Sequence, residues 1–207
     1  NAKAAREVAN QLKKVDFKGI LIAISNPVDV ITSLYQHYSG LPKERVIGTG
    51  TLLDTARMKR AVGQAFDIDA RSVYGYNLGE HGSSQFTAWS QVRIKGQEIE
   101  HFANRETLEE IAQRVTVGGQ TVFQGKKYTN YGIASAAIRL ALAVVSDSHE
   151  ELPVSNYYQA FDTYLSYPAI VGRAGIIEQI KLNLTAEEEE KLLHSANFIK
   201  QKFANNL

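Results

Sequence analysis

The stretch GILIAISNPVDVITSLYQHYSG, residues 19–40, decides the fold. Its first seven residues form a short, continuously apolar run, which is typical of a strand buried on both faces. The segment from 27 to 40 then places Val30, Ile31 and Leu34 at helical spacing. A brief strand over 45–50 and a strong helix over 51–66 follow. This alternation predicts βα units and a parallel sheet.

The pattern changes after residue 70. Residues 73–78, 84–94 and 95–100 are predicted as antiparallel β structure, with Lys95-Gly96 as the hairpin turn. Helices are predicted to open at Asn104 and at Thr129, and further strands over 152–158, 164–172 and 175–184. We therefore predict an α/β fold followed by α+β: half of an α/β sheet, from residue 1 to about 70, joined to an α+β domain.

Amphipathic helices are predicted at both ends of the chain. The first has one apolar face, made by Ala5, Val8, Ala9 and Leu12. The last begins with a capping box of Thr185 and Glu188, and its apolar face holds Leu192, Ala196, Ile199 and Phe203. Because the chain of 207 residues opens on Asn1 and not on methionine, we expect a cut from a longer polypeptide; a processed mature protein is the alternative.

The composition excludes several classes of protein. The formal net charge is +1 and no block of Lys or Arg exceeds two residues, so nothing indicates a nucleic-acid partner. There are no cysteines, which excludes disulfides and thiolate metal sites. The longest apolar run is far too short to cross a bilayer. We expect a soluble, cytoplasmic protein with no membrane partner.

His81 lies in the segment GYNLGEHGSSQF, residues 75–86, and differs from the other histidines. It follows a predicted strand and precedes Gly82, where the missing side chain would let a ligand approach closely. The remaining four histidines have ordinary structural interpretations: His37, His101, His149 and His194. No H-x-x-x-H or H-E-x-x-H pair occurs, so a zinc hydrolase has little support and we expect no metal site.

Two further clusters lie at predicted carboxyl ends of strands, where open α/β sheets gather ligands. Asp54 and Arg57 share one helical face, because they are three residues apart after the Gly48-Thr49-Gly50 bend. A surface ion pair is the alternative interpretation. Asn26 ends the buried strand, although the following proline would also suit a plain helix N-terminus.

Together the three clusters suggest an acid-base site. An arginine can bind a carboxylate through two parallel hydrogen bonds, and an aspartate can orient a histidine and raise the pKa of its imidazolium. The histidine can then exchange a proton with a hydroxyl or carbonyl oxygen. The sequence therefore predicts a site for a small carboxylated alcohol or ketone.

The motifs SNPVDV, VIGTGTLLDTAR and GYNLGEHGSSQF, in this order, resemble the L-lactate and malate dehydrogenase superfamily, on its L-2-hydroxyacid dehydrogenase side. The segments LLDTARM, GEHG-x-SQF and SYPAI are most similar to bacterial L-2-hydroxyisocaproate dehydrogenases. The resemblance covers nearly the whole chain. It implies the C-terminal part of a Rossmann-type NAD-binding domain over residues 1–50, a lactate/malate dehydrogenase-like substrate domain over 51–207, and a homo-oligomer, either a dimer or a tetramer.

The resemblance also implies roles for individual residues. His81 is expected to donate and accept the proton, and Asp54 to stabilise its charged form. Arg57 is expected to bind the carboxylate of a 2-keto or 2-hydroxy acid. Asn26 is expected to contact substrate and cofactor, with Ser25 also on the cofactor side, and the bond from Asn26 to Pro27 is expected to be cis. Thr129 is expected to line the pocket near the nicotinamide.

Some features depart from the family pattern. The G-x-G-x-x-G fingerprint, the acidic residue for the ribose and the mobile loop with a second arginine are not found, and the sequence GTG at 48–50 does not replace the fingerprint. We expect the chain to correspond to the C-terminal two-thirds of such an enzyme, to be inactive alone and to bind NAD poorly.

Further positions bear on specificity and regulation. Gly118 and Gly119 fall inside a predicted helix that borders the substrate side-chain pocket in relatives, so they are expected to make room for a branched aliphatic group; a kink or helix end is the alternative. Ser83 replaces an aspartate of many lactate dehydrogenases. Sugar-bisphosphate-activated relatives have a basic residue and a histidine at the positions of Lys59 and Tyr74. The loss of the histidine argues against that allosteric site.

Two other classes of function stay open. A fragment could act only as an oligomerisation or structural module, since the helix over 52–66 corresponds to a subunit contact in the family. An unrelated hydrolase could use His81 with Glu80 or Asp54, but no G-x-S-x-G nucleophile motif occurs.

Overall fold

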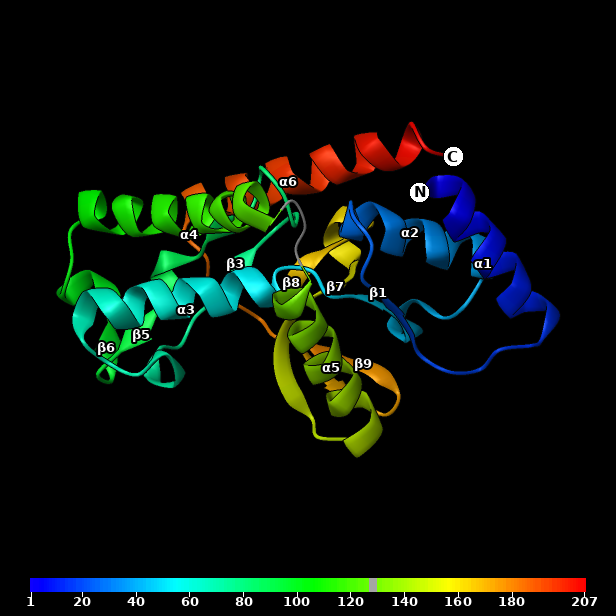
Figure 1. Cartoon of the computed structure of the whole chain (residues 1–207), viewed down its shortest axis with the longest axis horizontal. Coiled ribbons are helices and arrows are strands. Elements are labelled where there is room, and N and C mark those ends of the chain that lie inside the picture. The colour runs from blue at the N-terminus through cyan, green and yellow to red at the C-terminus, as the bar shows by residue number, and fades with distance from the viewer. Residues whose placement is uncertain (127–129) are drawn as a thin grey trace.

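The computed structural model describes residues 1–126 and 130–207, with only the backbone described at 116–124 and at 126. Helices pack around a five-stranded sheet (Figure 1). The helices are α1 Ala2–Lys14, α2 Val28–Ser39, α3 Leu52–Phe66, α4 Arg105–Lys126, α5 Tyr131–Ser146 and α6 Ala186–Ala204. The strands of the central sheet are β1 Leu21–Ala23, β2 Val46–Gly48, β7 Glu150–Tyr158, β8 Thr163–Gly172 and β9 Gly175–Gln179.

The central sheet has the order β1-β2-β7-β8-β9. Strands β1 and β2 are parallel, as the βα pattern predicts, whereas β7, β8 and β9 form an antiparallel meander. The two parts meet where Gly48 of β2 pairs with Ser155 of β7 in antiparallel orientation. The predicted mixture of α/β and α+β structure is therefore present, and five strands from its two parts form one sheet.

Two small hairpins lie outside the central sheet: β3 Asn77–Leu78 with β4 Phe86–Thr87, and β5 Arg93–Ile94 with β6 Gln97–Glu98. The predicted turn at Lys95-Gly96 is confirmed, with φ angles of 51° and 79°. The prediction of continuous β structure over 84–94 is wrong, because a 3-10 turn at Trp89–Gln91 interrupts it. Ala88 before the turn and Val92 after it are both buried.

The helix that carries Asp54 and Arg57, α3, is anchored in two hydrophobic clusters. Leu52 packs with Leu140 of α5 and Leu152 of β7, while Met58 packs with Ile111 of α4 and other residues. The first turn of α3 is therefore held against the sheet. Among the described residues, no helix has both the length and the apolar character needed to cross a membrane.

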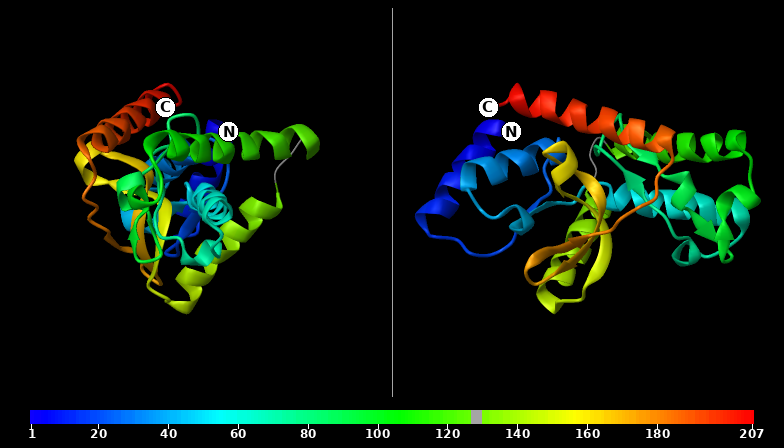
Figure 2. Two further views of the ribbon diagram at one scale, coloured as in Figure 1. Left: turned by 90° about the vertical axis from the view of Figure 1, so that its left-hand side faces the viewer. Right: turned by 180° about the vertical axis from the view of Figure 1, so that it is seen from behind.

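The last helix, α6, runs along the molecule from α4 to the α1–α2 pair (Figures 1 and 2). Its capping box of Thr185 and Glu188 is confirmed. The predicted apolar face is also present, because Leu192, Ala196 and Ile199 are buried beside Leu34 of α2 and Phe203 packs partly buried against the same cluster. In α1 the predicted face is only partly buried: Ala5 and Ala9 lie in the core, but Val8 is exposed.

Two glycines allow the close approach of segments that build the site. Gly50, just before α3, has φ of 50°, and a Cβ there would lie 2.5 Å from both the Ser155 nitrogen and the Ser166 Oγ. Gly79, after β3, has φ of 90°, and a Cβ would lie 2.6 Å from the Ser195 Oγ of α6. A side chain at either position would strain the backbone and clash with its neighbours.

Candidate active site

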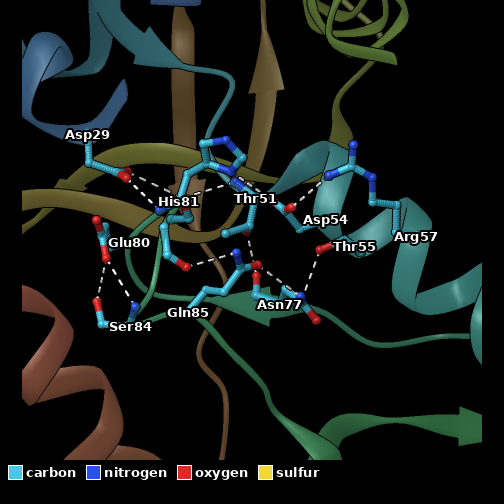
Figure 3. A network of polar contacts seen from close by, with 12 residues as sticks. Asp29, Thr51, Asp54, Thr55, Arg57, Asn77, Glu80, His81, Ser84 and Gln85 are labelled. Carbon is cyan, nitrogen blue, oxygen red and sulfur yellow. Dashed lines mark hydrogen bonds and ion pairs between the residues drawn. The ribbon is translucent and has the colours of Figure 1, made fainter. Parts of the chain in front are cut away.

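His81 lies in the turn that follows β3. Two backbone hydrogen bonds of 2.9 and 2.8 Å join Gly79 to Ser166 of β8 and fix this turn against the sheet. The Nδ1 atom of His81 lies 2.5 Å from Oδ2 of Asp54, which α3 presents from its first turn (Figure 3). The Asp54 side chain is 7% exposed and that of His81 is 23% exposed, so water screens the pair only weakly.

Arg57 approaches the other oxygen of the same carboxylate, with its Nη1 atom 3.3 Å from Oδ1 of Asp54. Asp54 therefore contacts the imidazole with one oxygen and the guanidinium with the other (Figure 3). The ion pair is not a surface pair, because its aspartate is buried. A single contact of 3.3 Å does not engage the planar guanidinium fork, which can still bind a second carboxylate through parallel hydrogen bonds.

The electrostatic surroundings of His81 favour its protonated form. Burial opposes the charged imidazole and lowers its pKa, but the hydrogen bond and charge of Asp54 and the charge of Asp29 outweigh burial and the nearby Arg57. The pKa of His81 therefore lies above its ordinary value of 6.5. A histidine in this environment carries a proton at neutral pH in a larger fraction of molecules than a free imidazole does.

Asp29, in the first turn of α2, is a site residue that the sequence analysis missed. Its Oδ2 atom accepts a hydrogen bond of 2.7 Å from the backbone N–H of His81. The carboxyl group is buried, and burial raises its pKa to about 6, although the His81 N–H works in the opposite direction. The available signal was an aspartate between Val28 and Val30, since a charged residue within an apolar segment needs a partner.

Glu80 is buried beside His81 and fixes the same turn. Its Oε2 atom accepts hydrogen bonds from the Ser84 backbone N–H at 3.1 Å and from the Ser84 Oγ at 2.7 Å (Figure 3). Its own N–H donates to the Ser195 Oγ of α6 at 2.6 Å. The expectation that Gly82 makes room for a ligand needs correction, because a Cβ there would lie 2.3 Å from Oε1 of Glu80. The missing side chain makes room for this carboxylate.

Comparison with known proteins identifies the family. Residues 51–206 match the lactate/malate dehydrogenase α/β C-terminal domain, and residues 1–48 match the NAD binding domain of the same family. The chain belongs to the lactate/malate dehydrogenase family. Members of this family use NAD, and the described part of this chain carries the family's second domain together with a piece of its first.

Individual lactate dehydrogenases are similar over nearly the whole chain. L-lactate dehydrogenases of Priestia megaterium and Clostridium botulinum are 36% and 38% identical over 97% and 99% of this chain. The chain spans 66% and 68% of their lengths, or about two thirds. The crystal structure of a lactate dehydrogenase from a deep-sea metagenome superposes with a TM-score of 0.96 at 34% identity, covering 100% of this chain and 69% of that one.

The other residues expected from the family resemblance follow β1 or lie in and after α4. Ser25 and Asn26 are exposed at the carboxyl end of β1, and the Asn26 backbone oxygen accepts a hydrogen bond from Asn1. The expected cis bond between Asn26 and Pro27 is present. Thr129 lies outside the described residues. Gly118 and Gly119 lie within α4, which agrees with the predicted helix. Only the backbone is described here, so their expected role beside the substrate side chain lies outside the described residues.

The remaining histidines differ from His81 in their surroundings. All four are exposed: His37, His101, His149 and His194. Tyr74 is exposed as well, whereas the pKa of Lys59 is lowered, first by burial and then by the charge of Arg139. Within residues 1–126 and 130–207, no group of three or more His, Asp and Glu side chains is placed to hold a metal ion.

Proposed function

We propose that this protein is the catalytic part of an NAD-dependent L-2-hydroxyacid dehydrogenase. The reaction is the reversible reduction of a 2-keto carboxylate to an L-2-hydroxy carboxylate. The observation that carries the proposal is the shared Asp54 carboxylate, which contacts the imidazole of His81 at 2.5 Å and the guanidinium of Arg57 at 3.3 Å. A proton donor and a carboxylate-binding group therefore stand side by side.

The three side chains divide the chemistry between them. Arg57 binds the substrate carboxylate and so orients the adjacent keto group toward His81. When bound, reduced NAD supplies the hydride that adds to the carbonyl carbon and is itself oxidised. The carbonyl oxygen takes the proton from His81, and Asp54 stabilises the imidazolium before transfer. In the oxidative direction the neutral imidazole accepts the hydroxyl proton.

The sheet also offers a place that fits the nicotinamide end of NAD. Strands β1 and β2 are parallel, and ligands of such sheets bind beyond the carboxyl ends of the strands. The exposed, polar Ser25 and Asn26 lie at this edge of β1. Asp29, three residues after Asn26, contacts the backbone of His81 and links this edge to the proton donor. Ser25 and Asn26 are therefore the residues that would hold the nicotinamide end.

The preferred substrate is proposed to be 2-ketoisocaproate or pyruvate, the keto acids of L-2-hydroxyisocaproate and L-lactate. The names of the relatives support lactate, whereas Gly118 and Gly119 motivate the larger aliphatic group. Replacing both glycines with leucine should shift selectivity toward pyruvate. Unchanged selectivity, measured as the ratio of kcat/KM for the two acids, would show that the two glycines do not determine the substrate preference.

We also propose that the enzyme acts as a homo-oligomer. Helix α5 exposes Ile138, Leu142 and Val145 along one face, at 59%, 59% and 73% of their surfaces. An apolar stripe at this helical spacing suits burial against another subunit. Assembly alone, without catalysis, is the competing function, and it gives no reason for a buried Asp54 to hold His81.

The decisive assay follows the loss of NADH with 2-ketoisocaproate, pyruvate and oxaloacetate. It uses the 207-residue chain and the same chain preceded by the additional N-terminal segment of the Priestia megaterium relative. We expect turnover in the extended protein and none after His81→Gln, with an unchanged circular dichroism spectrum. A folded, oligomeric extended protein that reduces none of the three acids would favour the structural module instead.

A further inference from the structure

The buried carboxylate of Asp29 contacts the backbone of His81 and the side chain of Ser166. One oxygen accepts the His81 backbone N–H at 2.7 Å, and the other accepts a hydrogen bond from the Ser166 Oγ at 3.3 Å. Asp29 is 1% exposed, so these groups replace the water that an ionised carboxylate would otherwise need. A buried carboxylate that binds the main chain of a catalytic histidine fixes the backbone from which its ring projects.

Ser166 extends this contact to the helix that carries Asp54. Its Oγ accepts a hydrogen bond of 3.0 Å from the backbone N–H of Thr51, the residue directly before α3. Its backbone also pairs with Gly79, two residues before His81. A continuous set of hydrogen bonds therefore runs from His81 through Asp29 and Ser166 to the start of α3.

We propose that Asp29 is a positioning residue whose carboxylate holds the His81 main chain in a fixed position relative to the start of α3. Its negative charge also favours the imidazolium. The inference deepens the proposed function, on which it rests for the role of His81 as the proton donor. Asp29 itself touches neither the imidazole nor the substrate in this arrangement. It acts from the side of α2 that adjoins the nicotinamide edge of the sheet.

Charged groups lie near His81 on two neighbouring helices and on its own turn. Asp54 and Arg57 face it from α3, Asp29 from α2, and Glu80 from its own turn. Asp54 touches the ring, so its effect on the proton is larger than that of Asp29. The contribution of Asp29 is nevertheless separable, because an asparagine preserves its shape and its acceptor for the His81 N–H while removing the charge.

The test is a titration of the histidine ring protons by NMR, using the 207-residue chain, with His81 assigned through His81→Gln. Asp29→Asn should shift the His81 pKa downward, by less than Asp54→Asn does. Glu188→Gln is the matched control, because Glu188 is a buried carboxylate that also accepts a backbone N–H, from Ser90 at 3.1 Å. This control should leave the His81 titration unchanged.

A second variant tests the structural part of the proposal. Asp29→Ala removes the acceptor for the His81 N–H, so hydrogen exchange at this amide should become at least about tenfold faster. If Asp29→Ala does not fold, faster exchange of the Thr51 amide in Ser166→Ala tests the other end of the same set of hydrogen bonds. An unchanged His81 pKa in Asp29→Asn, or unchanged exchange at these amides, would overturn the proposal.

Kinetics of the extended enzyme complete the test. Asp29→Asn should lower kcat for keto-acid reduction with little change in KM, because the carboxylate-binding Arg57 is untouched. The pH above which reduction declines should also move downward with the His81 pKa. The NMR results need no turnover, so an enzyme without activity would count against the proposed function and leave the role of Asp29 separately measurable.

Discussion

Replacing Asp29 with asparagine should stabilise the protein at neutral pH. The wild-type carboxylate is buried, and burial raises its pKa from 3.8 to about 6, so above that pH the folded protein holds a charge that water would solvate better. One pKa unit corresponds to about 1.4 kcal/mol, so the buried charge lowers the free energy of unfolding by about 3 kcal/mol at neutral pH. An uncharged, isosteric amide avoids this cost.

The sign of the pH dependence follows from the raised folded-state pKa. The stabilising contribution of Asp29 is fully present below pH 3.8 and is lost as the pH rises through about 6. The asparagine variant has no such titration. The free energy of unfolding of the variant minus that of the wild type should therefore rise by about 3 kcal/mol between about pH 4 and pH 8.

Urea unfolding followed by circular dichroism measures this difference at each pH. The other carboxyl groups titrate in both proteins, so their contributions largely cancel in the difference. A difference that stays constant to within about 0.5 kcal/mol across the range would refute the reasoning, since extrapolation errors are of that order. Asp29 would then be neutral or well solvated in the folded protein.

Three further predictions concern neighbouring residues. Arg57→Lys should raise KM for keto acids about tenfold or more, because an ammonium cannot form two parallel hydrogen bonds; steady-state kinetics showing an unchanged KM would contradict this. Asp54→Asn should lower the His81 pKa, so reduction, which needs the imidazolium, should decline at a lower pH in a pH–rate profile. Gly50→Ala should lower the free energy of unfolding by about 1 to 3 kcal/mol, measured by thermal unfolding, because φ is positive and the Cβ clashes; an unchanged Tm would count against it.

Much of the site could be predicted because its chemistry is encoded locally. Asp54 and Arg57 are three residues apart on one helix, so their common face follows from helix geometry alone. The βα alternation placed the start of that helix at a carboxyl edge of the sheet. The pairing of Asp54 with His81 was a chemical hypothesis that the family resemblance supported, since no local pattern specifies which turn faces which helix.

Long-range contacts explain what the sequence did not reveal. The link between Asp29 and His81 spans distant segments, and an aspartate two residues after a proline is easily interpreted as a favourable residue in the first turn of a helix. The antiparallel pairing of Gly48 with Ser155, which joins the two parts of the sheet, is equally invisible to local periodicity. The short turn at Trp89–Gln91 interrupts a region whose composition favours strands.

The contact between the Glu80 N–H and Ser195 has a practical consequence for directed evolution. Ser195 belongs to α6, far from His81 in the sequence, yet it bonds to the residue next to His81. A library restricted to substrate-lining positions would omit this helix. Randomising the buried face of α6 around Ser195 gives access to small displacements of the proton donor without changing His81, Asp54 or Arg57.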